Sequence, residues 1–161
     1  ARNSITWRMW GPTCTDTICI DARKMKDGDR AGLAAFNGDS GILTIKKDGS
    51  NYTLVMSEES VRLSDRTKEI TAVDAKEIES VKLSKGKVGK IYLCITGDFN
   101  PGRGDVANFY YSLDGKTFKQ IGTANYKMRF DYRRLFMGTR YAAFYYPTKT
   151  TGGQITVGLK N

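Results

Sequence analysis

Aromatic and arginine side chains beside turn-like residues are the part of this sequence best suited to hold a ligand. An exposed aromatic ring offers a flat apolar face for stacking, and a guanidinium fork bonds a pair of hydroxyls or a carboxylate. The candidate ligand-binding residues are Trp10, Arg129, Tyr132, Arg133, Tyr145 and Tyr146. Side chains of these kinds suit a ring-shaped, hydroxyl-rich ligand.

Alternation along the chain separates the exposed aromatic residues from the buried ones. Trp7 shares its face with two apolar neighbours, so it is predicted to lie in the core. Trp10 falls on the opposite face, just before a Gly-Pro turn, and is predicted to be exposed. Tyr145 and Tyr146 are adjacent and point to opposite faces, so one of the two is expected at the surface.

The positive charge of the chain widens the range of ligands to consider. The net charge is +9, and a field of this sign attracts nucleic acid, anionic membranes and acidic polysaccharides alike. For Arg129 and Arg133 the alternative is an ordinary surface pairing with Asp131. The aromatic–basic strand pattern of single-strand binders is not visible, so a basic–aromatic nucleic-acid binder is the more distant hypothesis. No apolar run approaches the length of a membrane span.

Catalysis by this chain alone is not expected. There is no histidine, which removes the commonest general base and the usual imidazole metal ligand. Glycoside cleavage needs two carboxyls held roughly 5–10 Å apart. The neighbouring acids Glu58 and Glu59, and Asp27 and Asp29, lie in polar, turn-like stretches where solvated carboxylates are the simpler interpretation. We therefore predict neither a catalytic nor a metal site, and no cofactor.

The three cysteines are predicted to be free thiols. Cys14 and Cys19 are five residues apart in an extended stretch, which places their Cα atoms roughly 16 Å apart and beyond disulfide reach. Cys94 lies in an apolar strand pattern and is read as a small buried hydrophobe. A bridge between Cys14 and Cys94 remains the alternative.

Hydrophobic residues alternate with a period of 2 almost everywhere, and glycine-based turns separate the runs. This pattern predicts an all-β sandwich or barrel in one domain, residues 1–161. The short β-rich runs are residues 5–9, 16–21, 31–36, 42–45, 52–56, 91–95, 109–111, 141–145 and 155–157. Residues 65–83 are predicted to form two strands around an exposed loop at Asp74 to Lys76.

Four segments carry a resemblance to a known family. Residues 7–14 read WRMWGPTC, and residues 25–36 read MKDGDRAGLAAF. Residues 109–118 read FYYSLDGKTF, and residues 137–153 read MGTRYAAFYYPTKTTGG. In order and spacing they are similar to the C-terminal sandwich domain of β-xylosidases and arabinofuranosidases of glycoside hydrolase family 43. The resemblance extends over nearly the whole chain.

This resemblance implies a concanavalin A-like jelly-roll of two antiparallel sheets, attached to a hydrolase that acts on xylan or arabinoxylan. It implies plant polysaccharide and the parent catalytic domain as partners, and an extracellular or periplasmic location. The leading hypothesis is a non-catalytic module, excised from a larger hydrolase, that recognises xylan-type polysaccharide. The alternative is a structural buttress without sugar binding. The final segment, residues 154–159, lacks the acidic residues that relatives often carry there, so a structural calcium ion has no support.

Overall fold

The computed structural model describes residues 3–83, 88–102, 104–129 and 138–160, and these form strands and turns without a helix. The strands are β1 (Ser4–Arg8), β2 (Thr13–Asp21), β3 (Asp29–Phe36), β4 (Asp39–Asp48), β5 (Asn51–Leu63), β6 (Ile70–Leu83), β7 (Lys90–Asp98), β8 (Val106–Ser112), β9 (Lys119–Gln120), β10 (Tyr126–Lys127), β11 (Arg140–Pro147) and β12 (Thr156–Leu159). Since the described residues contain no helix, none of them forms a helix able to cross a membrane.

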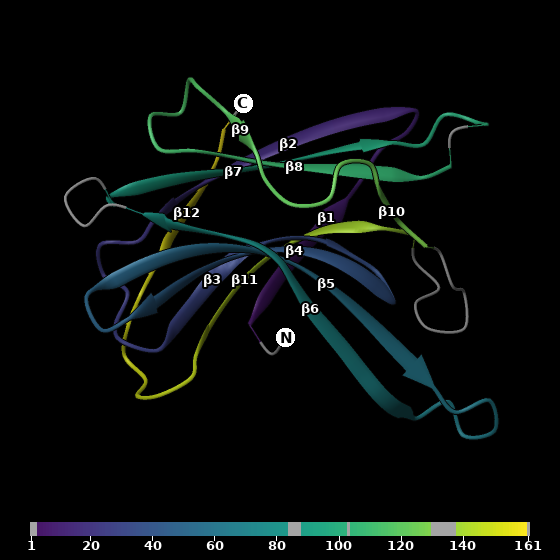
Figure 1. Ribbon diagram of the computed structural model, residues 1–161, viewed down its shortest axis with the longest axis horizontal. Coiled ribbons are helices and arrows are strands. Elements are labelled where there is room, and N and C mark those ends of the chain that lie inside the picture. The colour runs from purple at the N-terminus through teal and green to yellow at the C-terminus, as the bar shows by residue number, and fades with distance from the viewer. Residues whose placement is uncertain (1–2, 84–87, 103, 130–137, 161) are drawn as a thin grey trace.

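The strands form two antiparallel sheets packed face to face (Figure 1). Sheet A has the order β1-β11-β3-β4-β5-β6, and sheet B has the order β10-β8-β7-β2-β12, with β9 paired to β8. In Figure 1 the β5–β6 hairpin of sheet A bends away from sheet B and reaches beyond the rest of the sandwich. The predicted two-sheet antiparallel sandwich is confirmed.

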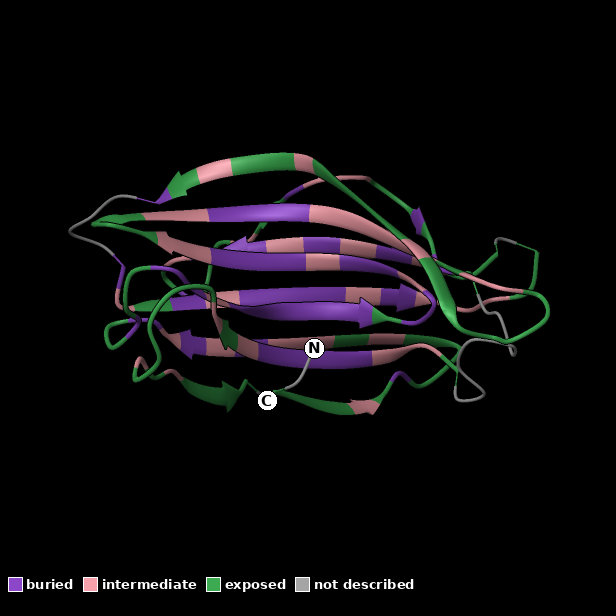
Figure 2. Ribbon diagram, turned by 90° about the horizontal axis from the view of Figure 1, so that it is seen from below, coloured by how far each residue is buried: buried purple, intermediate pink, exposed green. Residues whose placement is uncertain are grey.

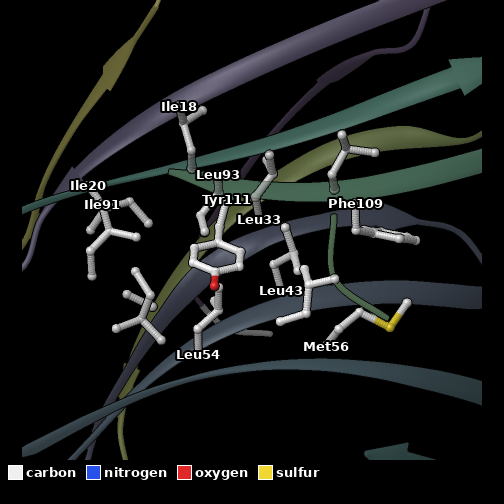
Figure 3. Close-up of a cluster of buried hydrophobic side chains, with 14 of the residues drawn as sticks. Ile18, Ile20, Leu33, Leu43, Leu54, Met56, Ile91, Leu93, Phe109 and Tyr111 are labelled. Carbon is white, nitrogen blue, oxygen red and sulfur yellow. The ribbon is translucent and has the colours of Figure 1, made fainter. Parts of the chain in front are cut away.

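The core lies between the two sheets because alternate residues of each strand point inward. In β3, for example, Leu33 is fully buried toward sheet B, while its neighbour Ala34 belongs to a separate small cluster on the other face of the sheet. Figure 3 shows the labelled side chains of the two sheets pointing toward one another, with Phe109 and Tyr111 among them. The largest fully buried side chains are Phe109, Ile18, Ile20, Leu33, Leu43, Ile45, Leu54, Met56, Ile91, Leu93, Ile95 and Ile121.

The prediction that residues 65–83 form two strands around a loop was wrong. The expected loop at Asp74 to Lys76 lies inside the continuous strand β6, where Asp74 pairs with Ser60 and Lys76 with Glu58. The chain instead reverses at residues 64–69, which are closed by backbone hydrogen bonds between Ser64 and its turn partners. β6 is an edge strand with mostly exposed side chains, so polar residues can continue it while their backbone groups pair with β5.

The cysteines are free, as predicted, and Cys14 and Cys19 lie on the same strand, β2. Cys14 accepts a hydrogen bond from the Tyr141 hydroxyl, with 3.1 Å between oxygen and sulfur. Cys94 is 7% exposed, and burial raises the pKa of its thiol.

We expect all three thiols to titrate in denaturant without reductant, and Cys94 to be protected in the native protein. A buried thiol with a raised pKa forms little of the thiolate that reacts. Ellman's reagent at pH 8 measures both counts. Replacing Cys94 with alanine should lower the denatured count by one and leave the fast native reaction unchanged. A single thiol in denatured wild-type protein would contradict the prediction, because it would reveal a disulfide.

Candidate ligand-binding groove

The outer face of sheet A, which points away from the core, carries a groove of about 820 Å³. Figure 2, seen from below, looks onto this sheet. A cavity of this size lies within the range of small-molecule and cofactor sites. The groove is lined by Ser4, Thr6, Ala34, Phe36, Ser40, Ile42, Thr44, Lys46, Val55, Ser57, Glu59, Ala75, Lys76, Glu77, Ala142, Phe144 and Tyr146.

Small side chains from neighbouring strands form the floor of the groove. Ala142 of β11 pairs with Ala34 of β3, Ala34 with Ile42 of β4, and Ile42 with Ser57 of β5. Since paired residues point to the same face of a sheet, these four lie in one row across it. Because three of these four side chains are short, the row leaves a shallow, largely apolar channel with room for a ligand.

A second row of paired residues on this face has a glycine at its centre. In this row, Gly32 of β3 pairs with Phe144 of β11 on one side and with Thr44 of β4 on the other. A Cβ atom placed on Gly32 would come within 2.6 Å of the Phe144 ring and within 1.8 Å of the Leu43 carbonyl oxygen. Glycine therefore lets the Phe144 ring lie down over the sheet.

Aromatic rings border the groove toward two opposite ends of the strands. Phe36 at the end of β3 is 38% exposed, and Tyr146 near the end of β11 is 41% exposed. Phe36 pairs with Arg140, and Tyr146 lies six residues further along β11. The backbone positions of Phe36 and Tyr146 are therefore about 20 Å apart in the strand direction. Tyr146 also stacks on Phe144, with ring centroids 6.1 Å apart and an interplanar angle of 27°. These rings offer two separate apolar faces along one channel.

The charged residues of the groove balance one another. Its lining contains two lysines, Lys46 and Lys76, and two glutamates, Glu59 and Glu77. Lys46 and Glu77 form an ion pair that crosses β5. Hydroxyls of serine and threonine supply most of the remaining polar atoms of the lining. The groove is therefore suited to a neutral, hydroxyl-rich chain.

Tyr145 and Tyr146 point to opposite faces, as alternation predicted. Tyr146 is the exposed residue and lines the groove. Tyr145 turns inward, packs against the core and donates a hydrogen bond from its hydroxyl to Asp29 Oδ2 over 2.9 Å. Burial, followed by the hydrogen bond to Asp29, raises the pKa of Tyr145 to about 12. The position of Tyr145 is structural, which leaves Tyr146 as the groove-facing member of the pair.

Trp10 is 65% exposed, but it is not among the residues that line the groove. Its ring lies under the Arg8 guanidinium, 4.8 Å from the ring centroid, just past the end of β1. Trp7 stacks on Tyr141 with centroids 5.6 Å apart and packs against the core, as predicted. Because β1 and β11 run antiparallel, Trp10 and Tyr146 lie toward opposite ends of sheet A.

Of the predicted arginine cluster, Arg129 is among the residues that the structure describes. Its guanidinium Nε lies 2.9 Å from Asp39 Oδ2, so a surface carboxylate already pairs with it. Tyr132 and Arg133, with the suggested partner Asp131, lie outside the described residues. Among the predicted residues that the structure describes, only Tyr146 lines the groove.

Two of the groove's main features were not predicted from the sequence, namely Phe36 and the row of small residues. Phe36 alternates with the buried Ala35 and precedes an Asn-Gly turn, and this position could have marked it as exposed. The small residues carry no comparable signal, because only the strand register brings them side by side on one face of the sheet.

The acidic pairs considered for catalysis take part in structural contacts. Thr123 Oγ1 donates to Glu58 over 2.6 Å, which ties the loop after β9 to sheet A. Asp27 accepts from the Gly49 backbone N–H over 2.6 Å and pairs with Lys149. Within the described ranges, no group of three or more His, Cys, Asp or Glu residues is arranged to hold a metal ion.

Comparison with known proteins finds a matching family model and similar solved structures. A family model described as the β-xylosidase C-terminal concanavalin A-like domain matches residues 1–157. A solved family 43 glycoside hydrolase, engineered to display endo-xylanase and exo-arabinofuranosidase activity, is 29% identical with a TM-score of 0.86. A bifunctional family 43–CE protein of Bacteroides eggerthii is 32% identical with a TM-score of 0.80. No curated protein matches.

A third solved structure shows the fold alone. It is a family 43 protein from a capybara gut metagenome, 19% identical over 89% of this chain, with a TM-score of 0.64. The first two structures match 99% of this chain, but the chain spans only 30% and 19% of their own lengths. Most of each relative therefore lies outside the region of similarity.

Proposed function

Because this chain belongs to the family of β-xylosidase C-terminal concanavalin A-like domains, we propose that it is a non-catalytic module that binds xylan-type polysaccharide. The groove on the outer face of sheet A is the proposed binding site, and the partner in the same protein is a family 43 catalytic domain. The proposed location is outside the cytoplasm, where plant polysaccharide is encountered.

The observation that supports this proposal is the groove with its two aromatic ends. A sugar ring has an apolar face that stacks on an aromatic ring, and its hydroxyls need polar partners. Phe36 and Tyr146 supply such rings from backbone positions about 20 Å apart in the strand direction. Between them the floor is low, and hydroxyl groups such as those of Thr6 and Thr44 line the channel. This arrangement suits an extended chain of several sugars.

The charge balance of the groove favours a neutral chain over a polyanion. A nucleic-acid site neutralises phosphates with a stripe of lysine and arginine, whereas this lining pairs Lys46 with Glu77. Because its lysines and glutamates balance, the lining contributes nothing to the net charge of +9. A nucleic-acid binder is therefore the weaker candidate.

A structural role beside a catalytic domain is the second candidate, and one observation favours it. The β5–β6 hairpin extends beyond the sandwich (Figure 1) and exposes Ile70 and Val73, which are 64% and 52% accessible. Two apolar side chains on a protruding hairpin are suited to packing against another domain. This role does not compete for the groove, so both can hold in one protein.

Replacing Tyr146 with alanine, or Phe36 with alanine, should weaken binding of xylohexaose about tenfold each. Loss of one stacking ring removes roughly 1–3 kcal/mol of apolar burial. Isothermal titration calorimetry measures the change, and affinity electrophoresis on soluble xylan provides a second measurement. Trp10→Ala is the control, since it deletes an aromatic that is more exposed than either and lies outside the groove.

The outcomes separate the candidate sites. Loss of binding in Trp10→Ala with none in Tyr146→Ala or Phe36→Ala would move the site to the end of β1. A wild-type module that binds no neutral xylan or arabinoxylan would contradict the proposal and leave the structural role. Release of xylose or arabinose from aryl glycosides by the module would contradict its non-catalytic status.

A further inference from the structure

Two arginines lie directly opposite each other at one end of sheet A. Arg8 of β1 and Arg140 of β11 are paired in register. Like charges at opposed positions of an antiparallel pair destabilise a sheet unless something compensates them. Both residues share the outer face with the groove, because they alternate with the inward-facing Trp7 and Tyr141.

The side chains of this arginine pair are held in place by their neighbours. Arg140 donates from Nε to Thr6 Oγ1 over 3.1 Å, and from Nη2 to the Thr6 carbonyl oxygen over 3.4 Å. The Arg8 guanidinium lies over the Trp10 ring at 4.8 Å. These contacts leave further N–H donors of each guanidinium available, because a guanidinium carries five.

Within the part of the chain that the structure describes, neither guanidinium of the pair lies within ion-pair distance of a carboxylate. Other arginines of the described surface have such a partner, for example Arg30 with Asp48 and Arg129 with Asp39. The Arg8–Arg140 pair is therefore a concentrated positive charge that an external anion would compensate.

The pair lies at the end of the groove that Phe36 borders. Arg140 is opposite Phe36 in the strand register, and Thr6, two residues before Arg8, lines the groove itself. Two residues of a strand span about 7 Å. A sugar chain stacked on Phe36 would thus bring a side group within reach of both guanidinium groups.

We propose that Arg8 and Arg140 form a carboxylate subsite for a uronic acid carried by the xylan chain. This inference rests on the proposed function, since the neutral groove holds the backbone and the arginine pair holds the acidic substituent. Planar guanidinium groups bond carboxylates in a forked geometry, which lysine cannot reproduce. A single carboxylate matches the site better than a polyanion, because the adjoining groove is charge-balanced.

The test compares two ligands of equal backbone length by calorimetry, namely xylotetraose and xylotetraose with one glucuronic acid substituent. Wild-type protein should bind the acidic ligand about tenfold more tightly at low salt, as expected for hydrogen bonds between charged groups. Arg140→Gln and Arg8→Gln should each reduce this preference and leave affinity for xylotetraose unchanged. Raising the salt concentration to about 0.5 M should also reduce the preference, through screening.

Arg62→Gln is the matched control, because it removes one positive charge from an exposed arginine on the β5–β6 hairpin. It should retain the full preference, and Arg140→Lys should lose most of it while keeping the charge. Thermal midpoints confirm that each variant is folded. Equal affinity of wild-type protein for the two ligands would overturn the subsite while leaving the neutral groove intact. Binding of the acidic ligand alone would support the subsite and contradict the groove, and binding of neither would overturn both.

Discussion

Replacing Phe109 with alanine is expected to lower the free energy of unfolding by about 3–5 kcal/mol, the range for deleting a core aromatic ring. Phe109 of β8 is fully buried and lies edge-on to Tyr126, with ring centroids 5.9 Å apart. Its ring also reaches across to sheet A, where a Cβ on Gly41 would come within 2.3 Å of it. The ring therefore fills space between the sheets, and its removal would leave a cavity there.

Urea unfolding followed by tryptophan fluorescence measures this loss. Trp10→Ala serves as the control, since it removes a larger aromatic ring that is 65% exposed and should cost about 1 kcal/mol or less. Phe109→Leu should lie between wild type and Phe109→Ala, because it keeps part of the volume. A cost below about 1 kcal/mol for Phe109→Ala would show that the sheets close over the cavity.

Alternation was sufficient to predict the sandwich because most strands bury one face. Leu33 and Leu43, for instance, are apolar residues between outward-facing neighbours, and their strands end at the turn dipeptides Asn37-Gly38 and Asp48-Gly49. The middle of β6 lacked this signal, since residues 73–77 of this edge strand are all exposed and bury no apolar face, whereas Ile78, Val81 and Leu83 further on pack against the core. The sequence of residues 74–76 therefore looked like a loop although its backbone is paired.

The groove was harder to predict than the fold for a similar reason. Tyr146 could be recognised because adjacent tyrosines must point to opposite faces. The relation of Tyr146 to Phe36, 110 positions apart in the chain, depends on the register of β11 against β3. Local patterning does not determine that register. The same holds for Arg8 and Arg140, which become a pair only through the β1–β11 register.

Alkaline pH is expected to destabilise the fold through its buried tyrosines. Burial, reinforced by the negative charges of Asp39 and Glu58, raises the pKa of Tyr126 to about 12. The pKa of Tyr145 is also raised to about 12, and burial followed by the hydrogen bond to Cys14 raises the pKa of Tyr141. In each case the folded protein holds the phenol proton more tightly than the unfolded chain, whose tyrosines titrate near 10.

The direction of the pH effect follows from this difference. Stability contributed by a raised pKa is complete below pH 10, and it is lost as the pH rises from 10 through about 12. Tyr126 is 8% exposed, and a rise in pKa from 10 to about 12 corresponds to a loss of up to about 3 kcal/mol. Tyr145 contributes less because it is only half-buried and solvent screens its charge.

Urea unfolding at pH 8, 10 and 11.5, with tyrosinate absorbance at 295 nm, tests this expectation. Wild-type protein should lose several kcal/mol between pH 10 and 11.5, and the tyrosinate contributed by the buried rings should appear together with unfolding. Tyr126→Phe keeps the ring against Phe109 but cannot ionise, so it should match wild type at pH 8 within about 1 kcal/mol and lose less at pH 11.5. Lysines also lose charge in this pH range, but equally in both proteins, so the difference between them isolates Tyr126. Identical losses would show that its phenol titrates in the native state as freely as in the unfolded chain.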